Sequence, residues 1–236
     1  HGTMFLTGDF DKKTHTFDRK RVQAIDYGLD FYAPQSLETS DGRRVMIAWM
    51  QNWATCHSQP EKFRWFGQMT LPRELKIVDG RIFQNPVREL EAFRVNPVIH
   101  KNVAVSQETT LEGVSGRILD MTVTVRPGDE DGYRKFKLCF AKGGDCFSSV
   151  SFRPATGKVR MDRTFSGFAY DIVNNRSFLV DAAEEVKIRV IMDRFSVELF
   201  FNDGKQAATM TLYTPQDCDG ITFQAEGNVL VDVEKY

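Results

Sequence analysis

Cysteine and histidine are scarce in this chain, and neither is spaced as a metal site requires. The four histidines are far apart, and the four cysteines include no C-x-x-C pair: Cys56, Cys139, Cys146 and Cys218. This pattern argues against a zinc site, and the sequence predicts no metal and no cofactor. Only Cys139 and Cys146 flank a single turn. A cross-strand disulfide and two free thiols both remain open there, and buried free thiols are the favoured interpretation.

Long apolar runs and an excess of either charge are also missing. No apolar stretch approaches the roughly 18–20 residues that a membrane span needs, and the start His1-Gly2-Thr3-Met4 shows no signal-peptide pattern. The 31 Lys and Arg residues nearly balance 32 Asp and Glu residues, for a formal net charge of −1. Nucleic-acid binding usually needs a basic excess. We therefore expect neither nucleic acid nor a membrane as a partner.

Apolar residues in the second part of the chain recur with a period of two. Val186, Ile188 and Val190 alternate with charged residues, and the same alternation recurs around 121–125, 197–201, 221–225 and 229–233. Turn signals such as Asn202-Asp203-Gly204 separate these stretches. Short alternating strands with frequent turns are typical of a β-sandwich, which we expect over residues 96–236.

The first part of the chain, residues 1–95, is also predicted to be built from strands. We expect strands over 5–10, 30–37, 43–49, 71–78 and 81–83, with a hairpin turn at Asp79-Gly80. The only helix-like stretch is 87–94, and the prolines at 86 and 97 make it too short to define a helical domain. The fold class predicted for the whole chain is therefore all-β.

Aromatic side chains gather in this first part. It holds all three tryptophans of the chain together with other rings: Trp49, Trp53, Trp65, Phe31, Tyr32, Phe63 and Phe66. Amides and an arginine lie between them. A sugar offers apolar C–H faces for stacking and hydroxyls for hydrogen bonds, so rings mixed with amides indicate a saccharide site. A buried core cluster is the alternative interpretation.

Several segments in order resemble one enzyme family. They are Asp26–Gln35 (DYGLDFYAPQ), Gly42–Met50 (GRRVMIAWM), Trp65–Leu75 (WFGQMTLPREL), Met161–Gly167 (MDRTFSG) and Ser196–Gly204 (SVELFFNDG). Together they resemble the β-fructosidases of glycoside hydrolase family 32, which include invertases, sucrose-6-phosphate hydrolases, levanases and exo-inulinases. The resemblance covers nearly the whole chain.

The resemblance implies a five-bladed β-propeller followed by a β-sandwich. A blade takes roughly 40–50 residues, and about ninety residues precede the predicted sandwich. Only one full blade and part of a neighbour fit in that length. We therefore expect residues 1–95 to form the last blade or blades of the propeller and residues 96–236 to form the sandwich. On this interpretation the chain is the C-terminal portion of a β-fructosidase.

The resemblance implies hydrolysis of terminal β-fructosyl bonds in sucrose or fructans by a retaining mechanism, which needs two carboxyl groups about 5–5.5 Å apart. The family carries these groups in a W-M-N-D-P-N-G-like segment, an R-D-P segment and an E-C segment. None of the three occurs in this sequence. We therefore expect no catalytic residue here, and no activity from the chain alone. A carbohydrate-binding module and a structural or assembly module are the alternatives.

The resemblance also suggests residues that would line a fructose site. Trp49 matches the family's pocket tryptophan, although a core ring is the alternative, and Asp30 could instead serve a blade turn. The predicted substrate-binding set is Asp30, Tyr32, Trp49, Asn52 and Gln68. Arg73-Glu74 is more typical of a structural ion pair near the interdomain seam. The partners we expect are a fructose-containing saccharide and either the missing N-terminal propeller portion or another copy of the chain.

Overall fold

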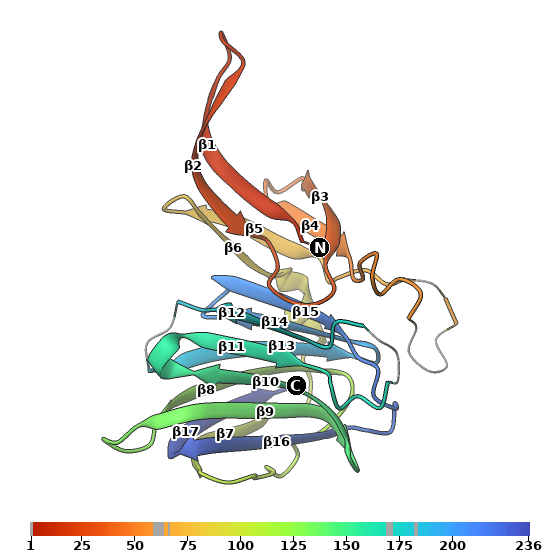
Figure 1. The fold of residues 1–236 in the computed structure, drawn as a ribbon, viewed down its shortest axis with the longest axis vertical. Coiled ribbons are helices and arrows are strands. Elements are labelled where there is room, and N and C mark those ends of the chain that lie inside the picture. Colours follow the sequence, from red (N-terminus) through yellow and green to blue (C-terminus); the bar gives the residue numbers. More distant parts are fainter. Residues whose placement is uncertain (1, 59–63, 66, 169–171, 182–183) are drawn as a thin grey trace.

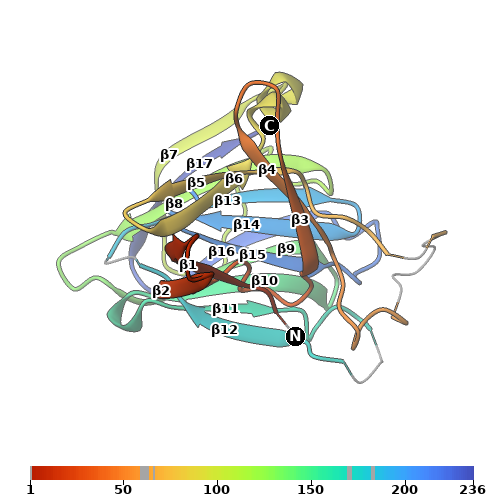
Figure 2. The same cartoon turned by 90° about the horizontal axis from the view of Figure 1, so that it is seen from above.

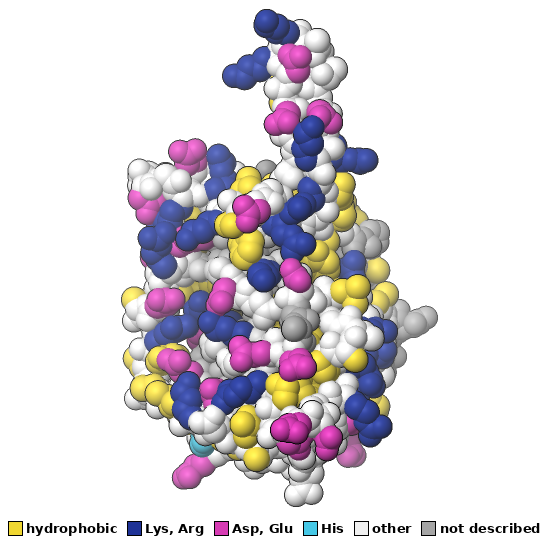
Figure 3. Space-filling view, turned by 90° about the vertical axis from the view of Figure 1, so that its left-hand side faces the viewer, with side chains coloured by type: hydrophobic (Ala, Val, Ile, Leu, Met, Phe, Trp, Pro, Cys, Tyr) yellow, Lys and Arg dark blue, Asp and Glu magenta, His cyan; other side chains and the backbone are white. Residues whose placement is uncertain are grey.

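The structure is a computed structural model that describes residues 2–58, 64–65, 67–168, 172–181 and 184–236. It has two parts, a small sheet assembly above a larger pair of sheets, and its regular structure is almost entirely β-strand (Figure 1). Within the described residues no helix is long and apolar enough to span a membrane. Figure 3 shows acidic and basic side chains interspersed over one face, in keeping with the balanced charge.

The first part holds one complete four-stranded antiparallel sheet with a hairpin beside it. The hairpin strands β1 (Met4–Asp11) and β2 (Thr16–Ala24) form a separate two-stranded sheet. The four-stranded sheet runs β3-β4-β5-β6, with bounds β3 (Tyr32–Glu38), β4 (Arg44–Trp49), β5 (Arg73–Val78) and β6 (Arg81–Pro86). Four antiparallel strands in sequence order are the unit of a β-propeller blade. The structure therefore contains one full blade and part of another, as the sequence predicts.

Strand β2 is the one strand of this first part that lies outside the predicted ranges. Its sequence, TFDRKRVQA, shows no apolar alternation, because most of its residues are exposed whichever way they face. Backbone pairing with β1 therefore defines this strand, and burial contributes little. The hairpin extends away from the rest of the molecule (Figure 1), and it is foreshortened when seen from above (Figure 2).

The second part is a β-sandwich of two antiparallel sheets. One has five strands in the order β12-β11-β10-β9-β16, and the other has six in the order β15-β14-β13-β8-β17-β7. The bounds are β7 (Val98–Val105), β8 (Leu119–Pro127), β9 (Tyr133–Gly143), β10 (Cys146–Arg153), β11 (Lys158–Asp162), β12 (Asn175–Leu179), β13 (Val186–Asp193), β14 (Ser196–Phe201), β15 (Gln206–Thr211), β16 (Gly220–Gly227) and β17 (Val229–Lys235). A 3₁₀ turn, η1 (Arg88–Phe93), joins the two parts where the sequence suggests a helix, and η2 (Pro154–Thr156) follows β10.

The main hydrophobic core lies between the two sheets of the sandwich. The inward residues Met121, Val123 and Val125 of β8 face Phe136 and Leu138 of β9 within this cluster, and all five are fully buried. Of the buried members of the cluster among the described residues, only Leu29 comes from the first part of the chain. Each such side chain contributes about 1.5–3 kcal/mol on burial. The sandwich therefore has a core of its own.

The four cysteines form no disulfide bond in the structure. This includes Cys139 and Cys146, which lie on the neighbouring strands β9 and β10. The favoured sequence interpretation, free thiols rather than a disulfide, is confirmed.

The blade sits on the outer face of the six-stranded sheet, at the β15 end (Figure 1). The sequence predicts a half-buried β14 with Glu198 and Phe200 turned outward. In the structure these outward residues are 2% and 1% exposed. The expectation of a solvent face was wrong here, because the blade covers that face of β14. Close approach is visible at Gly204 (φ +91°), where an added Cβ would lie 2.4 Å from the carbonyl oxygen of Gln84 in β6.

Candidate functional site

A buried arginine joins the blade to the sandwich. Arg73 of β5 has no exposed surface, and its Nη1 donates to Asp26 at 2.9 Å while its Nη2 donates to Glu198 of β14 at 2.6 Å. The guanidinium carbon also lies 5.2 Å from the ring centroids of Phe31 and Phe200. Burial by itself lowers the pKa of Arg73, but attraction to Glu198 and Asp26 outweighs it and raises the pKa. This cation is therefore held charged at the domain seam.

The neighbouring acid Glu74 has a different set of partners. Its carboxylate accepts from Arg88 Nη2 at 3.0 Å and from Arg43 Nη1 at 2.8 Å. The sequence places Arg73-Glu74 in a structural ion pair near the seam. The structure puts both residues in ion pairs, but each pairs with other residues. Arg73 lies at the seam, and Glu74 holds η1 against the blade.

A second buried cluster at the seam contains Asp30 and Asn52. Asp30 accepts hydrogen bonds from the backbone N–H of Thr211 at 2.8 Å and from Thr55 Oγ1 at 3.1 Å, and it forms an ion pair with Arg163 of the sandwich. Asn52 Nδ2 donates to the carbonyl of Leu29 at 2.8 Å and to Asp30 Oδ1 at 3.3 Å. The structure therefore brings these two predicted site residues together.

Both residues of this cluster are withdrawn from solvent. Asp30 is 0% exposed and Asn52 is 7% exposed. Since the oxygens of Asp30 already accept from the main chain, a hydroxyl and a guanidinium, the direct effect of this carboxylate is to fix the seam. Substrate contact by Asp30 and Asn52 stays a prediction.

The three remaining predicted residues lie at or beside an aromatic cluster. Tyr32 and Trp49 are cross-strand partners in β3 and β4, with ring centroids 6.4 Å apart. Trp53 packs edge-on against both, 5.5 Å from Trp49 and 6.4 Å from Tyr32. Trp53 remains 62% exposed, whereas Trp49 and Tyr32 are half-buried. The cluster is thus a partly open aromatic surface, not a closed core.

Gln68 lies between this cluster and the sandwich. Its side-chain Nε2 donates to the Phe195 carbonyl at 3.1 Å and to Thr211 Oγ1 at 3.2 Å. The backbone carbonyl of Gln68 accepts from the backbone N–H of Met50 at 2.7 Å. The preceding residue, Gly67, has φ +74° and lies close to Trp49. A Cβ added at Gly67 would be only 3.0 Å from Trp49 Nε1. Gln68 is half-buried and its amide is bonded to the sandwich.

The other predicted aromatics divide into two groups. Trp65 is 55% exposed and packs edge-on against Phe195 of the sandwich, with centroids 6.2 Å apart. Phe31 is buried at the seam. Phe63 and Phe66 lie outside the described residues. The structure therefore supports both interpretations of the aromatic group, a core ring for Phe31 and open rings for Trp53 and Trp65.

Sequence reasoning missed the acids and the arginine that fix the seam. Asp26, Arg163 and Glu198 all belong to segments of the family resemblance, yet neither spacing nor alternation reveals that they are buried. Residues of opposite charge from segments more than 100 positions apart meet there only after the two parts dock. Among the described residues, no group of three or more His, Cys, Asp or Glu side chains could hold a metal ion.

A propeller blade docked on a β-sandwich, with open aromatics at one end, defines an all-β protein of propeller-plus-sandwich architecture. The sequence matches the profile of the glycosyl hydrolases family 32 N-terminal domain over residues 1–86 and that of the glycosyl hydrolases family 32 C terminal over residues 89–236. The chain belongs to glycosyl hydrolase family 32.

Individual relatives agree with this assignment. The levanase of Bacillus subtilis (strain 168) is 32% identical over 250 residues, covering 98% of this chain and 36% of the levanase. The raffinose invertase of Escherichia coli is 30% identical, covering 89% of this chain and 42% of the invertase. The chain therefore spans well under half the length of these curated relatives.

Solved structures with a similar fold include a fructan exohydrolase. The solved structure of fructan 1-exohydrolase IIa from Cichorium intybus superposes with a TM-score of 0.82 at 21% identity, covering 97% of this chain and 53% of that chain. A variant of the same exohydrolase was solved in complex with 1-kestose. At this identity the likeness establishes the fold alone.

Proposed function

We propose that this chain supplies a saccharide-binding wall and the bracing sandwich of a β-fructosidase, which hydrolyses terminal β-fructosyl bonds in sucrose or fructans. Family membership supports the reaction class. The observation that carries the proposal is the partly open ring cluster of Tyr32, Trp49 and Trp53, where β3 begins and β4 ends. Such rings bind the C–H faces of sugars.

The catalytic carboxylates belong, on this proposal, to a separate propeller portion. The nucleophile and acid/base motifs implied by the family resemblance are absent from the sequence. Retaining hydrolysis needs both carboxyl groups, so this chain by itself positions a fructosyl unit without cleaving it. Residues 1–95 act as the propeller portion and residues 96–236 as the sandwich.

Asp30 and Asn52 act as positioning residues in this proposal. Asn52 Oδ1 accepts from the backbone N–H of Ala54 at 2.8 Å, and Thr55 donates to Asp30. These bonds fix the turn that carries Trp53, which lies between Asn52 and Ala54 in the chain. The buried seam therefore sets the direction of an exposed ring, and rigid support of this kind determines how well a site is positioned.

The sandwich alone is a weaker candidate for saccharide binding. All three tryptophans lie in the first part of the chain, so a stacking platform of tryptophan rings cannot form within residues 98–236. A purely structural role for the whole chain would not explain the exposed ring of Trp53 beside the half-buried ring of Trp49. The β-fructosidase proposal accounts for both parts.

The experiment joins this chain to the upstream portion of the Bacillus subtilis levanase and measures fructose release from sucrose and levan. Trp49→Ala should lower kcat/KM at least about tenfold, because fructose positioning weakens. Phe93→Ala, an exposed ring on η1 and 77% exposed, is the matched control and should leave kcat/KM unchanged. Equal kcat/KM values for Trp49→Ala and the parent would place Trp49 in the blade core and contradict the proposal.

A binding measurement on the chain itself covers the case in which the fusion does not fold. The indole N–H resonances of the chain are recorded while 1-kestose is added. We expect the Trp49 and Trp53 resonances to shift, with the Trp65 resonance changing less. Absence of any shift at saturating 1-kestose would contradict the proposed wall.

A further inference from the structure

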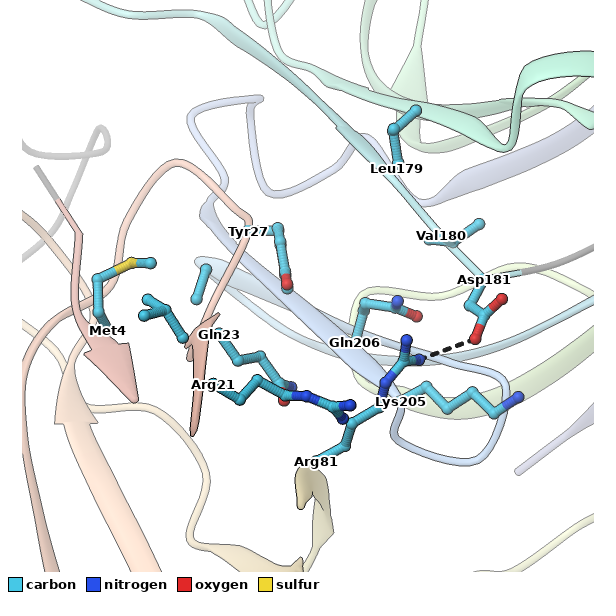
Figure 4. Close-up of a pocket in the computed structure, with 12 residues that line it drawn as sticks. Met4, Arg21, Gln23, Tyr27, Arg81, Leu179, Val180, Asp181, Lys205 and Gln206 are labelled. Atoms are coloured by element: carbon cyan, nitrogen blue, oxygen red, sulfur yellow. Dashed lines mark hydrogen bonds and ion pairs between the residues drawn. The ribbon is translucent and has the colours of Figure 1, made fainter. Parts of the chain in front are cut away.

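A hollow lies between the β1–β2 hairpin and the sandwich, away from the aromatic cluster. Its volume is about 660 Å³, within the range of roughly 300–1,000 Å³ that ligand pockets occupy. Strand β2, the start of β6, the end of β12 and the start of β15 all contribute to it (Figure 4). None of the predicted fructose-site residues lines this interdomain groove.

The interdomain groove concentrates positive charge. Three cationic side chains line it, Arg21, Arg81 and Lys205, against the single carboxylate of Asp181. Figure 4 shows Arg21 and Arg81 directed toward the same part of the groove. Arg81 Nη1 pairs with Asp181 at 2.9 Å, and Arg21 Nη1 donates to the carbonyl of Asp79 at 3.2 Å. Lys205 has no ion pair within the described part of the chain.

Cations that converge on a hollow repel one another unless an anion joins them. The chain as a whole is nearly neutral, with a formal net charge of −1, so this excess is local and not a general property of the surface. Arginine forks bind phosphate oxygens in a bidentate manner, and a phosphate dianion would balance the cations that Asp181 leaves uncompensated.

The wall beside these cations suits an organic body. Gln206 Oε1 is buried and has no hydrogen-bond partner among the described residues. It can accept from a ligand hydroxyl once its side chain turns toward the groove. Tyr27 presents a half-buried ring in the same groove, with Met4, Val22 and Leu179 along the sides. Next to the positive charge, the groove thus offers a hydrogen-bond acceptor, an aromatic ring and apolar side chains to the organic part of a ligand.

We propose that the interdomain groove binds a small phosphate-bearing polyol or sugar, with Arg21, Arg81 and Lys205 holding the phosphate and Gln206 accepting from a hydroxyl. The ligand would bridge the propeller portion and the sandwich, because Arg21 and Arg81 belong to the first and Lys205 and Gln206 to the second. This site does not depend on the proposed fructose wall.

The test measures binding to the whole chain by calorimetry, with fructose 6-phosphate, inorganic phosphate and fructose as separate probes. Fructose 6-phosphate should bind, inorganic phosphate should compete with it, and fructose should not. Arg81→Gln should weaken fructose 6-phosphate binding about five- to tenfold, and Asp181→Asn should strengthen it. Arg153→Gln, an exposed arginine outside the groove, is the matched control and should change nothing.

Two further variants separate the contacts. Gln206→Ala should weaken fructose 6-phosphate binding and leave inorganic phosphate binding unchanged. Trp49→Ala should leave fructose 6-phosphate binding intact; loss of binding in this variant would place the ligand at the aromatic cluster and overturn the proposal. Equal affinity for fructose and fructose 6-phosphate, or an affinity unaffected by Arg81→Gln, would overturn it as well.

Discussion

Arg73 of the blade and Glu198 of the sandwich form an ion pair of 2.6 Å from which solvent is excluded on both sides. The pair joins segments 125 residues apart and is completed by Asp26, which approaches the same guanidinium. A buried pair of this kind adds little net stability compared with apolar packing, but it strongly disfavours any docking in which one partner is left alone. It therefore specifies how the blade sits on the sandwich.

The first prediction concerns this pair. Arg73→Ala should reduce the free energy of unfolding by about 3–5 kcal/mol, because it leaves Glu198 and Asp26 buried without a counter-ion. Urea denaturation followed by fluorescence measures the change. Arg88→Ala is the comparison, because it removes an exposed partner of Glu74. It should reduce the free energy of unfolding by about 0–1 kcal/mol. Equal losses in the two variants would contradict the assigned role of Arg73.

A second prediction concerns acid stability. Hydrogen bonds from Arg88, with help from Arg43, lower the pKa of Glu74 from its ordinary value of 4.5 to about 2. Because the folded pKa is depressed, the stabilisation is present above about pH 4.5 and is lost as the pH falls toward 2. Glu74→Gln should flatten the fall in unfolding free energy across this window. Glu130→Gln, on an exposed turn, is the control, and an unchanged slope in Glu74→Gln would contradict the prediction.

The third prediction concerns the sandwich on its own. Almost every buried member of the main core lies between residues 105 and 233. A chain of residues 98–236 should therefore give a single cooperative thermal transition, although the bare outer face of β14 will lower its midpoint. Calorimetry of this segment is the measurement. Gradual melting would show that the blade is required for the sandwich to fold.

The hairpin and blade lead to a fourth prediction. Met4, Leu6 and Phe10 of β1 are at least half exposed, and both hairpin strands have a free edge. Leu37, Trp53 and Trp65 are similarly open. Exposed apolar surface beside free strand edges favours association, so the chain should bind either the upstream propeller portion or another copy of itself.

Light scattering combined with mass spectrometry measures this association. Leu6→Lys should weaken it by placing a charge on the open face of β1. Ile77→Lys, at the far end of β5 and more exposed than Leu6, tests whether any exposed apolar residue has the same effect. A stable monomer of about 27 kDa at high concentration, with no companion polypeptide, would contradict the prediction.

Alternation and turn chemistry could predict most of the fold, because one face of each sandwich strand packs in the core. Val186, Ile188 and Val190 are examples, all fully buried as expected. Strand β2 could not be found this way, since its side chains are exposed on both faces. The outward residue Glu198 was misjudged because burial by a second domain leaves no period in the sequence.

The candidate site was predictable only in part. The ring cluster of Tyr32, Trp49 and Trp53 follows from local composition and cross-strand pairing. The placement of Asp30 depends on Arg163, which is 133 positions away, so no local pattern reveals that this acid faces the sandwich. Whether these residues contact a sugar stays a prediction, which kinetics of the fused protein can test.

The most direct measurement is fructose release by the purified chain, assayed alone and after fusion to the levanase upstream portion. The account predicts no release from sucrose, inulin or levan above a buffer control for the chain alone, and clear release from the fusion. Both assays need the same protein concentration and mass-spectrometric proof that no other polypeptide is present. Robust turnover by the chain alone would contradict the central claim that this chain provides only the wall and the brace of a β-fructosidase.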